Sequence, residues 1–285
     1  SQCLQVIEYN WKAGIHNNEG ISSLSFGPNE TRKTLDLSEA SLMQGMKTMI
    51  GSGMHHIFIG LDHILFLLAL LLPGVVTRFS GNSETGTPTK LDNTVFPAAL
   101  KSYATAWVPN ESFRSSFIYV IKIVTFFTVA HTITLSLAAL EVIKLPGVLV
   151  ESIIAISIAL AALNNIIPML PQGREWLIAF IFGLFHGFGF ASVLADVGLG
   201  GDYLVLSLLG FNIGVEVGQI LIVAIIFPVL YLLRNTDLYR PILIYGSIFL
   251  ILVALNWASD RGLGTDFPLD DFVEKIYGKI LRRIL

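Results

Sequence analysis

The chain of 285 residues is poor in charge and contains a single cysteine, Cys3. Asp, Glu, Lys and Arg make up 14% of the residues, about half of the share that is usual in soluble domains. One cysteine cannot form an internal disulfide, and a net charge of −3 offers no basic surface for nucleic acid. The sequence therefore excludes a disulfide scaffold and a nucleic-acid binder, and its apolar content excludes a disordered chain.

Apolar residues dominate instead, at 53% of the chain, and the mean hydropathy is +0.69. A transmembrane helix needs about 20 mainly apolar residues. Six stretches meet this requirement: Gly53–Val76, Ser116–Val142, Gly147–Ile167, Glu175–Val197, Tyr203–Leu233 and Pro241–Trp257. We predict an all-α membrane protein with about six transmembrane helices in a bundle, which form a domain over residues 47–257.

The two flanking segments differ from this domain. Residues 1–46 mix polar residues with short β-like runs, and we expect an extramembrane segment that leans on another part of the protein, because two or three strands cannot bury a core. A short helix is expected from Ser38 to Gly53. The absence of an initial Met and of a signal-peptide pattern fits a processed or truncated chain. Residues 258–285 predict an amphipathic helix on the membrane surface.

Basic residues in the loops predict the orientation. The long loop Thr77–Ser115 and the loops after the third and fifth spans hold seven of them, whereas Lys144 is the only one after the second and fourth spans. Cytoplasmic loops carry an excess of Lys and Arg. We therefore expect the odd-numbered loops in the cytoplasm and both termini, including residues 1–46, outside it.

Ionisable side chains inside the spans are the candidates for a functional site. A charged group in the bilayer core costs at least ~2.5–3.5 kcal/mol on insertion scales. Counting from the ends of each span places one set of such residues near the midplane: Asp62, His63, His131, His186 and Glu216. An interhelical hydrogen bond is enough to explain one ionisable residue inside a span. A functional site explains better why four spans each place such a residue at the same depth.

Imidazole and carboxylate groups together suit a divalent transition metal such as zinc, nickel, copper or iron. The single Cys3 is far from the spans, which excludes a thiolate site. The candidate metal ligands are His56, Asp62, His63, His131, His186 and Glu216.

The first span raises a question of spacing. On a straight helix His56 and His63 would lie about 10 Å apart along the axis, too far for bonds near 2 Å to one ion. Gly60 between them leaves space for a ligand or a kink. Asp62 could be a ligand, or it could hold a neighbouring imidazole in the correct tautomer. The spacing favours two successive metal stations.

Four segments in order resemble the HupE/UreJ family of bacterial membrane proteins: His56-x5-Asp62-His63, Phe127–Leu135, Phe182–Ala191 and Phe211–Gln219. Members that are associated with transport carry a second histidine close to the position of His186, where this chain has Phe190, so the chain resembles a divergent branch. The resemblance implies a multi-pass protein of the bacterial inner membrane and uptake of nickel or cobalt.

Three functions follow from these patterns. The leading hypothesis is a divalent-metal transporter (nickel, cobalt or zinc) that uses the midplane residues. The first alternative is an intramembrane zinc-dependent hydrolase acting on a lipid-like substrate, with Glu216 or Asp62 as general base. The second is an accessory subunit of a larger membrane complex. The expected partners are the lipid bilayer, a divalent metal ion and, in the last case, other proteins.

Overall fold

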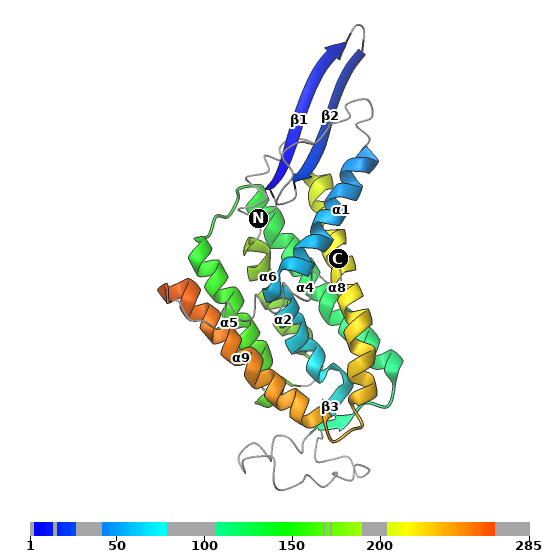
Figure 1. The fold of residues 1–285 in the computed structure, drawn as a ribbon, viewed down its shortest axis with the longest axis vertical. Coiled ribbons are helices and arrows are strands. Elements are labelled where there is room, and N and C mark those ends of the chain that lie inside the picture. Colours follow the sequence, from blue (N-terminus) through cyan, green and yellow to red (C-terminus); the bar gives the residue numbers. More distant parts are fainter. Residues whose placement is uncertain are drawn as a thin grey trace.

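The computed structural model describes residues 3–13, 16–26, 42–78, 107–167, 169–171, 173–189 and 204–265. Within these ranges, seven α-helices form a bundle (Figure 1). They are α1 (Leu42–Ile59), α2 (Leu61–Leu71), α4 (Phe113–Ala139), α5 (Gly147–Ile166), α6 (Glu175–Gly189), α8 (Leu204–Leu233) and α9 (Tyr239–Leu263). A 3-10 turn, η1 (Leu72–Val75), follows α2, and two antiparallel pairs complete the described fold: β1 (Cys3–Ala13) with β2 (His16–Phe26), and β3 (Val76–Arg78) with β4 (Trp107–Pro109).

In the described part of the chain, four helices are long and apolar enough to cross a membrane, namely α4, α5, α8 and α9, and α1 with α2 makes a fifth if the bent pair is one span. Helix α6 is apolar, but its 15 residues fall short of a full crossing. The second half of the predicted span Glu175–Val197 lies outside the described residues. The helical membrane architecture is therefore confirmed, whereas the predicted number of six spans is not.

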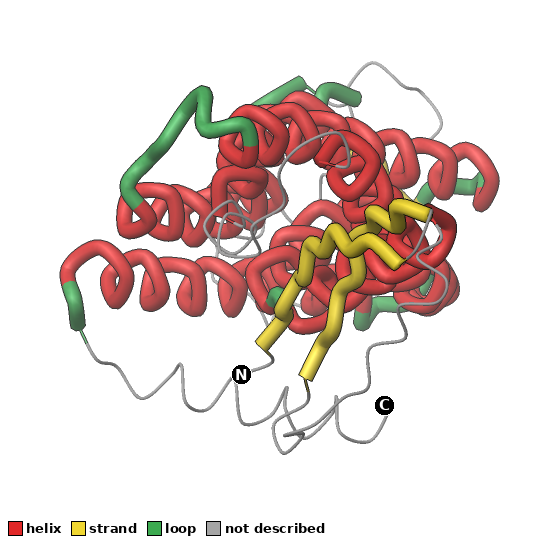
Figure 2. Tube along the Cα trace, turned by 90° about the horizontal axis from the view of Figure 1, so that it is seen from above, coloured by secondary structure: helices red, strands yellow, loops and turns green. Residues whose placement is uncertain are grey.

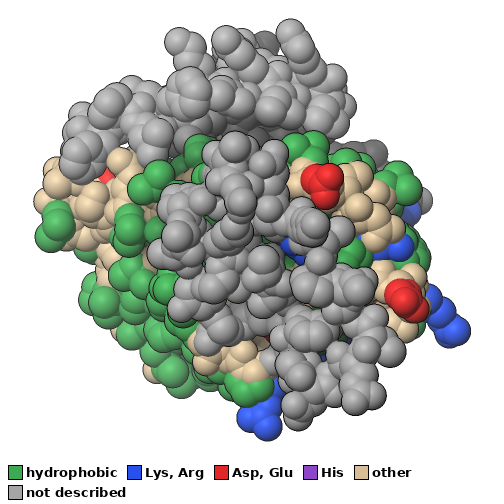
Figure 3. Space-filling view, turned by 90° about the horizontal axis from the view of Figure 1, so that it is seen from below, with side chains coloured by type: hydrophobic (Ala, Val, Ile, Leu, Met, Phe, Trp, Pro, Cys, Tyr) green, Lys and Arg blue, Asp and Glu red, His purple; other side chains and the backbone are tan. Residues whose placement is uncertain are grey.

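The outer surface of these helices is apolar. Side chains such as Val205, Ile225 and Leu232 are at least 70% exposed. Viewed from below, the described surface is mainly hydrophobic, and the few charged side chains are scattered over it (Figure 3). A surface of this kind is stable in contact with lipid, which agrees with a membrane protein.

The first predicted span is a broken helix. Helix α1 does not end near Gly53, as the sequence suggested, but continues to Ile59, and the chain then bends by 71° before α2 begins. Gly60 at the break has an extended ψ of 90°. A Cβ atom at this position would lie 2.9 Å from both the carbonyl oxygen of His56 and the Nδ1 of His63. The kink that Gly60 permits is therefore confirmed, and glycine is required for it.

The helices pack mainly in three pairs, α1 with α8, α4 with α6 and α5 with α9, and α2 contacts α4, α5, α8 and α9. Glycines let the backbones of two pairs approach closely, as is common between membrane helices. Gly53 of α1 and Gly214 of α8 each lie against the backbone of the opposite helix, and Gly183 and Gly187 of α6 do the same against α4. These contacts fix α1 and α6 against the two long helices.

The connections at the lower end of the bundle are joined to one another. Arg234, between α8 and α9, donates from Nε to the carbonyl oxygen of Asn110 at 2.8 Å, and Tyr231 donates to that of Glu111 at 2.5 Å. The predicted loop Thr77–Ser115 thus begins and ends in ordered structure, with β3 paired to β4. The connections after the first and fifth predicted spans therefore lie at the same end of the molecule, as alternating spans require.

The N-terminal segment has the expected β character. Strands β1 and β2 pair in continuous antiparallel register from Cys3–Phe26 to Ala13–His16. The hairpin extends beyond the helix ends, and β2 contacts α1 (Figures 1 and 2). The expected helix start at Ser38 and residues 266–285 of the predicted amphipathic helix lie outside the described residues. Helix α9 itself continues past Trp257 to Leu263.

Candidate metal centre

Four helices bring four histidines together. His56 of α1, His63 of α2, His131 of α4 and His186 of α6 form a group that we call the histidine cluster. His63 lies in its middle: its ring centroid is 4.7 Å from that of His56, 6.0 Å from that of His131 and 4.9 Å from that of His186. One ligand nitrogen from each of His56, His63 and His131 can be chosen so that all three lie within 4.8 Å of one another.

The expected separation between His56 and His63 was wrong. It assumed a straight helix, but the 71° bend at Gly60 changes the direction of the axis between the two residues. Their rings meet edge to face at 4.7 Å instead of standing about 10 Å apart. The two histidines therefore belong to one cluster rather than to two successive stations.

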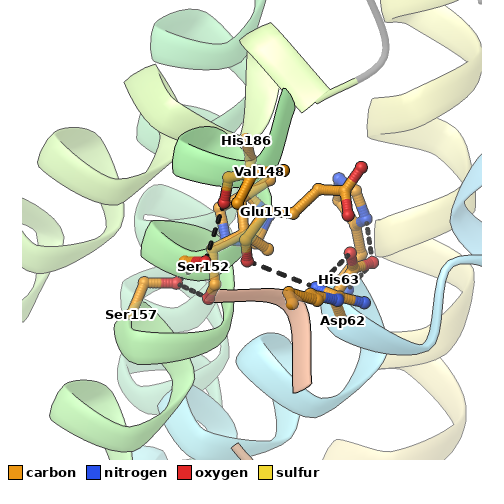
Figure 4. Close-up of polar contacts among 9 residues, drawn as sticks. Asp62, His63, Val148, Glu151, Ser152, Ser157 and His186 are labelled. Atoms are coloured by element: carbon orange, nitrogen blue, oxygen red, sulfur yellow. Dashed lines mark hydrogen bonds and ion pairs between the residues drawn. The ribbon is translucent and has the colours of Figure 1, made fainter. Parts of the chain in front are cut away.

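Asp62 contacts both the backbone and the imidazole of His63. Its Oδ1 accepts a hydrogen bond from the backbone N–H of His63 at 2.9 Å and lies 2.9 Å from the Nδ1 of the same residue (Figure 4). A carboxylate accepts, so Nδ1 carries the proton and Nε2 keeps a bare lone pair. Of the two predicted roles for Asp62, this contact supports the positioning of an imidazole.

His186 is oriented in the same manner by α5. Its Nε2 lies 3.0 Å from Oγ of Ser157, whose hydroxyl donates to the carbonyl oxygen of Ile154 at 2.6 Å. Because the hydroxyl hydrogen is already used, Nε2 of His186 must be the donor in this pair. Its Nδ1 is then left with the lone pair.

The tautomer of His131, on α4, is also set by a hydrogen bond to a residue outside the cluster. Its Nδ1 lies 3.3 Å from Oδ1 of Asn212, and Nδ2 of Asn212 donates to the carbonyl oxygen of Leu208 at 2.7 Å. The amide thus presents its oxygen to the imidazole, so Nδ1 of His131 donates and Nε2 carries the lone pair.

The lone pairs of these three histidines have no hydrogen-bond partner within the described part of the chain. Nε2 of His63, Nε2 of His131 and Nδ1 of His186 are all buried without one, and the three side chains are at most 5% exposed. An unsatisfied buried polar group costs about 1–3 kcal/mol. A cation is the kind of partner that bare imidazole nitrogens accept.

Glu216 lies on the contact between α4 and α8, and its Oε2 is buried without a hydrogen-bond partner in the described part of the chain. Its Oε1 accepts a hydrogen bond from Oγ1 of Thr125 at 2.7 Å, and Gln219 accepts one from Thr128 at 2.8 Å. Together with the pair of His131 and Asn212, these bonds join the two helices. The structure thus gathers His56, His63, His131 and His186, places Asp62 behind His63, and gives Glu216 an interhelical contact.

Two residues near the cluster were not predicted. In the sequence, Ser157 is only an isolated hydroxyl-bearing residue in an apolar stretch, and nothing there indicates a role beside a histidine. Arg261 lies beyond the predicted end of the sixth span, yet its Nη1 is 4.0 Å from Oδ2 of Asp62 and 3.4 Å from the carbonyl oxygen of Glu151. Its guanidinium also lies 5.3 Å from the ring centroid of Trp257. A single sequence does not reveal that the end of α9 reaches the break in the first span.

Comparison with known proteins gives one family. The model of the family described as HupE / UreJ protein matches residues 31–261, which include all the residues of the cluster. No curated protein and no solved structure gives a significant match.

Proposed function

The chain belongs to the HupE / UreJ family, and on this premise we propose that it transports a divalent transition metal of the nickel or cobalt type through the histidine cluster. The observation that carries the proposal is the set of three buried imidazole lone pairs, on His63, His131 and His186, that face no donor among the described residues. Each arises because the other nitrogen of the ring is used by Asp62, Asn212 or Ser157.

The dimensions of the cluster fit a metal ion that is bound and then released. Two nitrogens with bonds of about 2.1 Å to the same ion lie at most about 4.2 Å apart. The ligand atoms of His56, His63 and His131 lie within 4.8 Å of one another, so small side-chain rotations are enough to close the site. Neutral imidazoles without a thiolate bind borderline metals at moderate strength, which suits transport, because conduction requires release as well as binding.

The two carboxylates of the predicted site support transport rather than hydrolysis. A hydrolase needs a carboxylate that can take a proton from the metal-bound water. Asp62 faces His63 with one oxygen and Arg261 with the other, and Glu216 accepts from Thr125. Asp62 is thus engaged in positioning His63, and Glu216 is not among the residues whose ligand atoms lie within 4.8 Å of one another.

The finer topology belongs to the same proposal. We infer about six spans in a bacterial inner membrane. The basic connections at the β3–β4 end face the cytoplasm, because Lys and Arg are concentrated there. Both termini then lie on the opposite side.

The test is metal uptake by vesicles that contain the purified full chain. Nickel, cobalt, zinc and copper are offered separately, and elemental analysis measures the metal bound to the protein. We expect uptake above that of empty vesicles for at least one of these metals. The His63→Ala variant is expected to lose both uptake and stoichiometric metal, since it removes the central ligand.

His55→Ala is the control, because it also removes an imidazole, from the position next to His56 on α1, but from outside the group of ligand atoms that lie within 4.8 Å of one another. It should retain binding and uptake. Absence of uptake for all four metals would reject the transporter, and stoichiometric metal without uptake would direct attention to hydrolysis of lipid-like substrates. Loss of stability alone in His63→Ala, with no metal bound by the unmodified protein, would favour an accessory subunit.

A further inference from the structure

A cavity of about 410 Å³ lies at the β3–β4 end of the bundle, apart from the histidine cluster. It is half open and is bordered by η1, the two short strands, α4 as far as Ile123 and the start of α6, and apolar atoms make up most of its surface. Many of its lining residues offer an oxygen atom as a ligand or hydrogen-bond acceptor: Thr77, Asn110, Glu111, Ser112, Ser115, Ser116, Tyr119 and Glu175.

These oxygens are held by one another. Tyr119 donates its hydroxyl hydrogen to Oε2 of Glu175, which also accepts the backbone N–H of Gly173 at 2.8 Å. Asn110 donates from Nδ2 to Oγ of Ser116 at 2.9 Å. The described lining residues include no imidazole and no thiol. These oxygens, which include carboxylates, suit a cation that keeps its water shell, in contrast to the imidazoles of the cluster.

An aromatic layer separates the cavity from the cluster. The ring centroid of His186 is 5.1 Å from that of Phe66 and 5.1 Å from that of Phe127, and the two phenylalanines are 5.4 Å from each other. Both side chains are only 2% exposed. Leu70, one turn after Phe66 on α2, and Ile123, one turn before Phe127 on α4, already line the cavity. The layer is therefore about one helical turn thick, near 5 Å.

We propose that the cavity is a water-filled chamber for a hydrated divalent cation, and that Phe66 and Phe127 form a closed partition between this chamber and the histidine cluster. The proposal rests on the proposed transport function. The volume of 410 Å³ has room for on the order of ten waters, enough for the six-fold hydration shell that small divalent cations favour. The cation would exchange imidazole ligands for water on crossing the partition.

The partition is needed because a transporter must not leave a continuous water path. Apolar rings between two polar compartments exclude water and ions, as in hydrophobic gates. Helix α2 begins after the break at Gly60 and carries both His63 and Phe66, so any shift of α2 would move the two side chains together. Occupation of the cluster can in this way act directly on the position of Phe66.

Cysteine accessibility in the full chain tests the chamber. In a Cys3→Ser background, Ser116→Cys places a thiol in the chamber, and Ser157→Cys places one beside His186 beyond the partition. A charged, membrane-impermeant thiol reagent is applied from the side of the β3–β4 end. We expect Ser116→Cys to react roughly tenfold faster or more than Ser157→Cys, because a charged reagent does not enter a dry apolar layer. Nickel or cobalt should slow the reaction of Ser116→Cys, and adding Glu175→Gln should remove this protection.

Opening the partition supplies the second half of the test. Phe66→Ala, with Phe66→Leu as a milder variant if the first does not fold, should raise the reaction rate of Ser157→Cys from the same side. An unreactive thiol at position 116 in folded protein would overturn the water-filled chamber, and absence of metal protection would overturn its role as a cation chamber. Equal reactivity at positions 116 and 157 with Phe66 intact would overturn the partition. These readouts do not require a functional cluster, so they are separate from the loss of uptake that tests the transporter.

Discussion

At the scale of single residues, the cluster is built by the partners that the histidines have outside it. Asp62, Asn212 and Ser157 each engage one imidazole nitrogen and so leave the other nitrogen of His63, His131 and His186 facing the cluster. Burial then prevents water from satisfying these lone pairs. The arrangement is the one that outer hydrogen-bond partners impose on metal-binding histidines generally.

Replacing Asp62 by Asn tests whether this residue positions His63 or binds metal itself. The amide keeps the size of the side chain but removes the charge that favours a protonated Nδ1 on His63. We expect metal affinity to fall by about 10–100-fold, the usual effect of losing an outer partner of a ligand. The measurement is a metal titration of purified protein, accompanied by thermal unfolding.

The exposed pair of Glu141 and Lys144 provides the control, because Glu141→Gln also removes a carboxylate but far from the cluster. It should leave metal affinity unchanged. A complete loss of binding in Asp62→Asn, equal to that in His63→Ala, would show that Asp62 is a direct ligand, and an unchanged affinity would remove it from the site.

At the scale of elements, the position of each histidine depends on a break and on two close helix pairs. The break at Gly60 turns α2 so that His63 meets His56. Gly53 and Gly214 bring α1 against α8, and Gly183 and Gly187 bring α6 against α4. A larger residue in these pairs would separate the helices that carry the ligands.

Gly214→Ala is expected to destabilise the protein by about 1–3 kcal/mol, as is typical of overpacked interiors. The new methyl group would lie against the backbone of Ile50, which cannot move aside as a side chain can. Gly246→Ala in α9 is the matched control, since its methyl group would only contact Leu72 at 3.5 Å. Thermal unfolding in detergent compares the two, and equal stability would show that α1 and α8 do not need this close approach.

At the scale of the whole molecule, the bundle has two different ends. The β3–β4 end carries the cavity, the aromatic layer above it and the linked connections of Asn110 and Arg234. The other end carries the hairpin of β1 and β2 (Figure 1). A substrate that crosses the protein would meet the cluster and the cavity in succession.

The proposed orientation predicts opposite labelling of two exposed connections. In a Cys3→Ser background, Lys144→Cys lies between α4 and α5, and Asp237→Cys lies between α8 and α9. An impermeant maleimide should label the first in intact cells and the second only after permeabilisation, because basic connections remain in the cytoplasm. The reverse result would invert the orientation, and labelling of both from one side would contradict the alternating spans.

Much of the fold could be predicted from the sequence, because hydropathy reports directly on what contacts lipid. The helices α4, α5, α8 and α9 fall close to the predicted spans. The first span was predicted as one stretch in which Gly60 leaves space for a ligand or a kink, and hydropathy alone does not decide between the two. Helix α6 agrees with the first part of the predicted span Glu175–Val197, whose remainder lies outside the described residues.

The sequence by itself determined that this is a helical membrane protein and that histidines from several spans lie at one depth, because insertion energy depends on composition along each span. The tertiary structure alone decided which of them meet. The bend at Gly60 brings the rings of His56 and His63 into contact. Asp62 contacts His63 with one oxygen and Arg261 with the other, and Glu216 accepts a hydrogen bond from Thr125. Contacts between helices depend on the rotation of each helix about its axis and on the angle at which two helices cross, and the hydrophobic periodicity of a single span predicts neither.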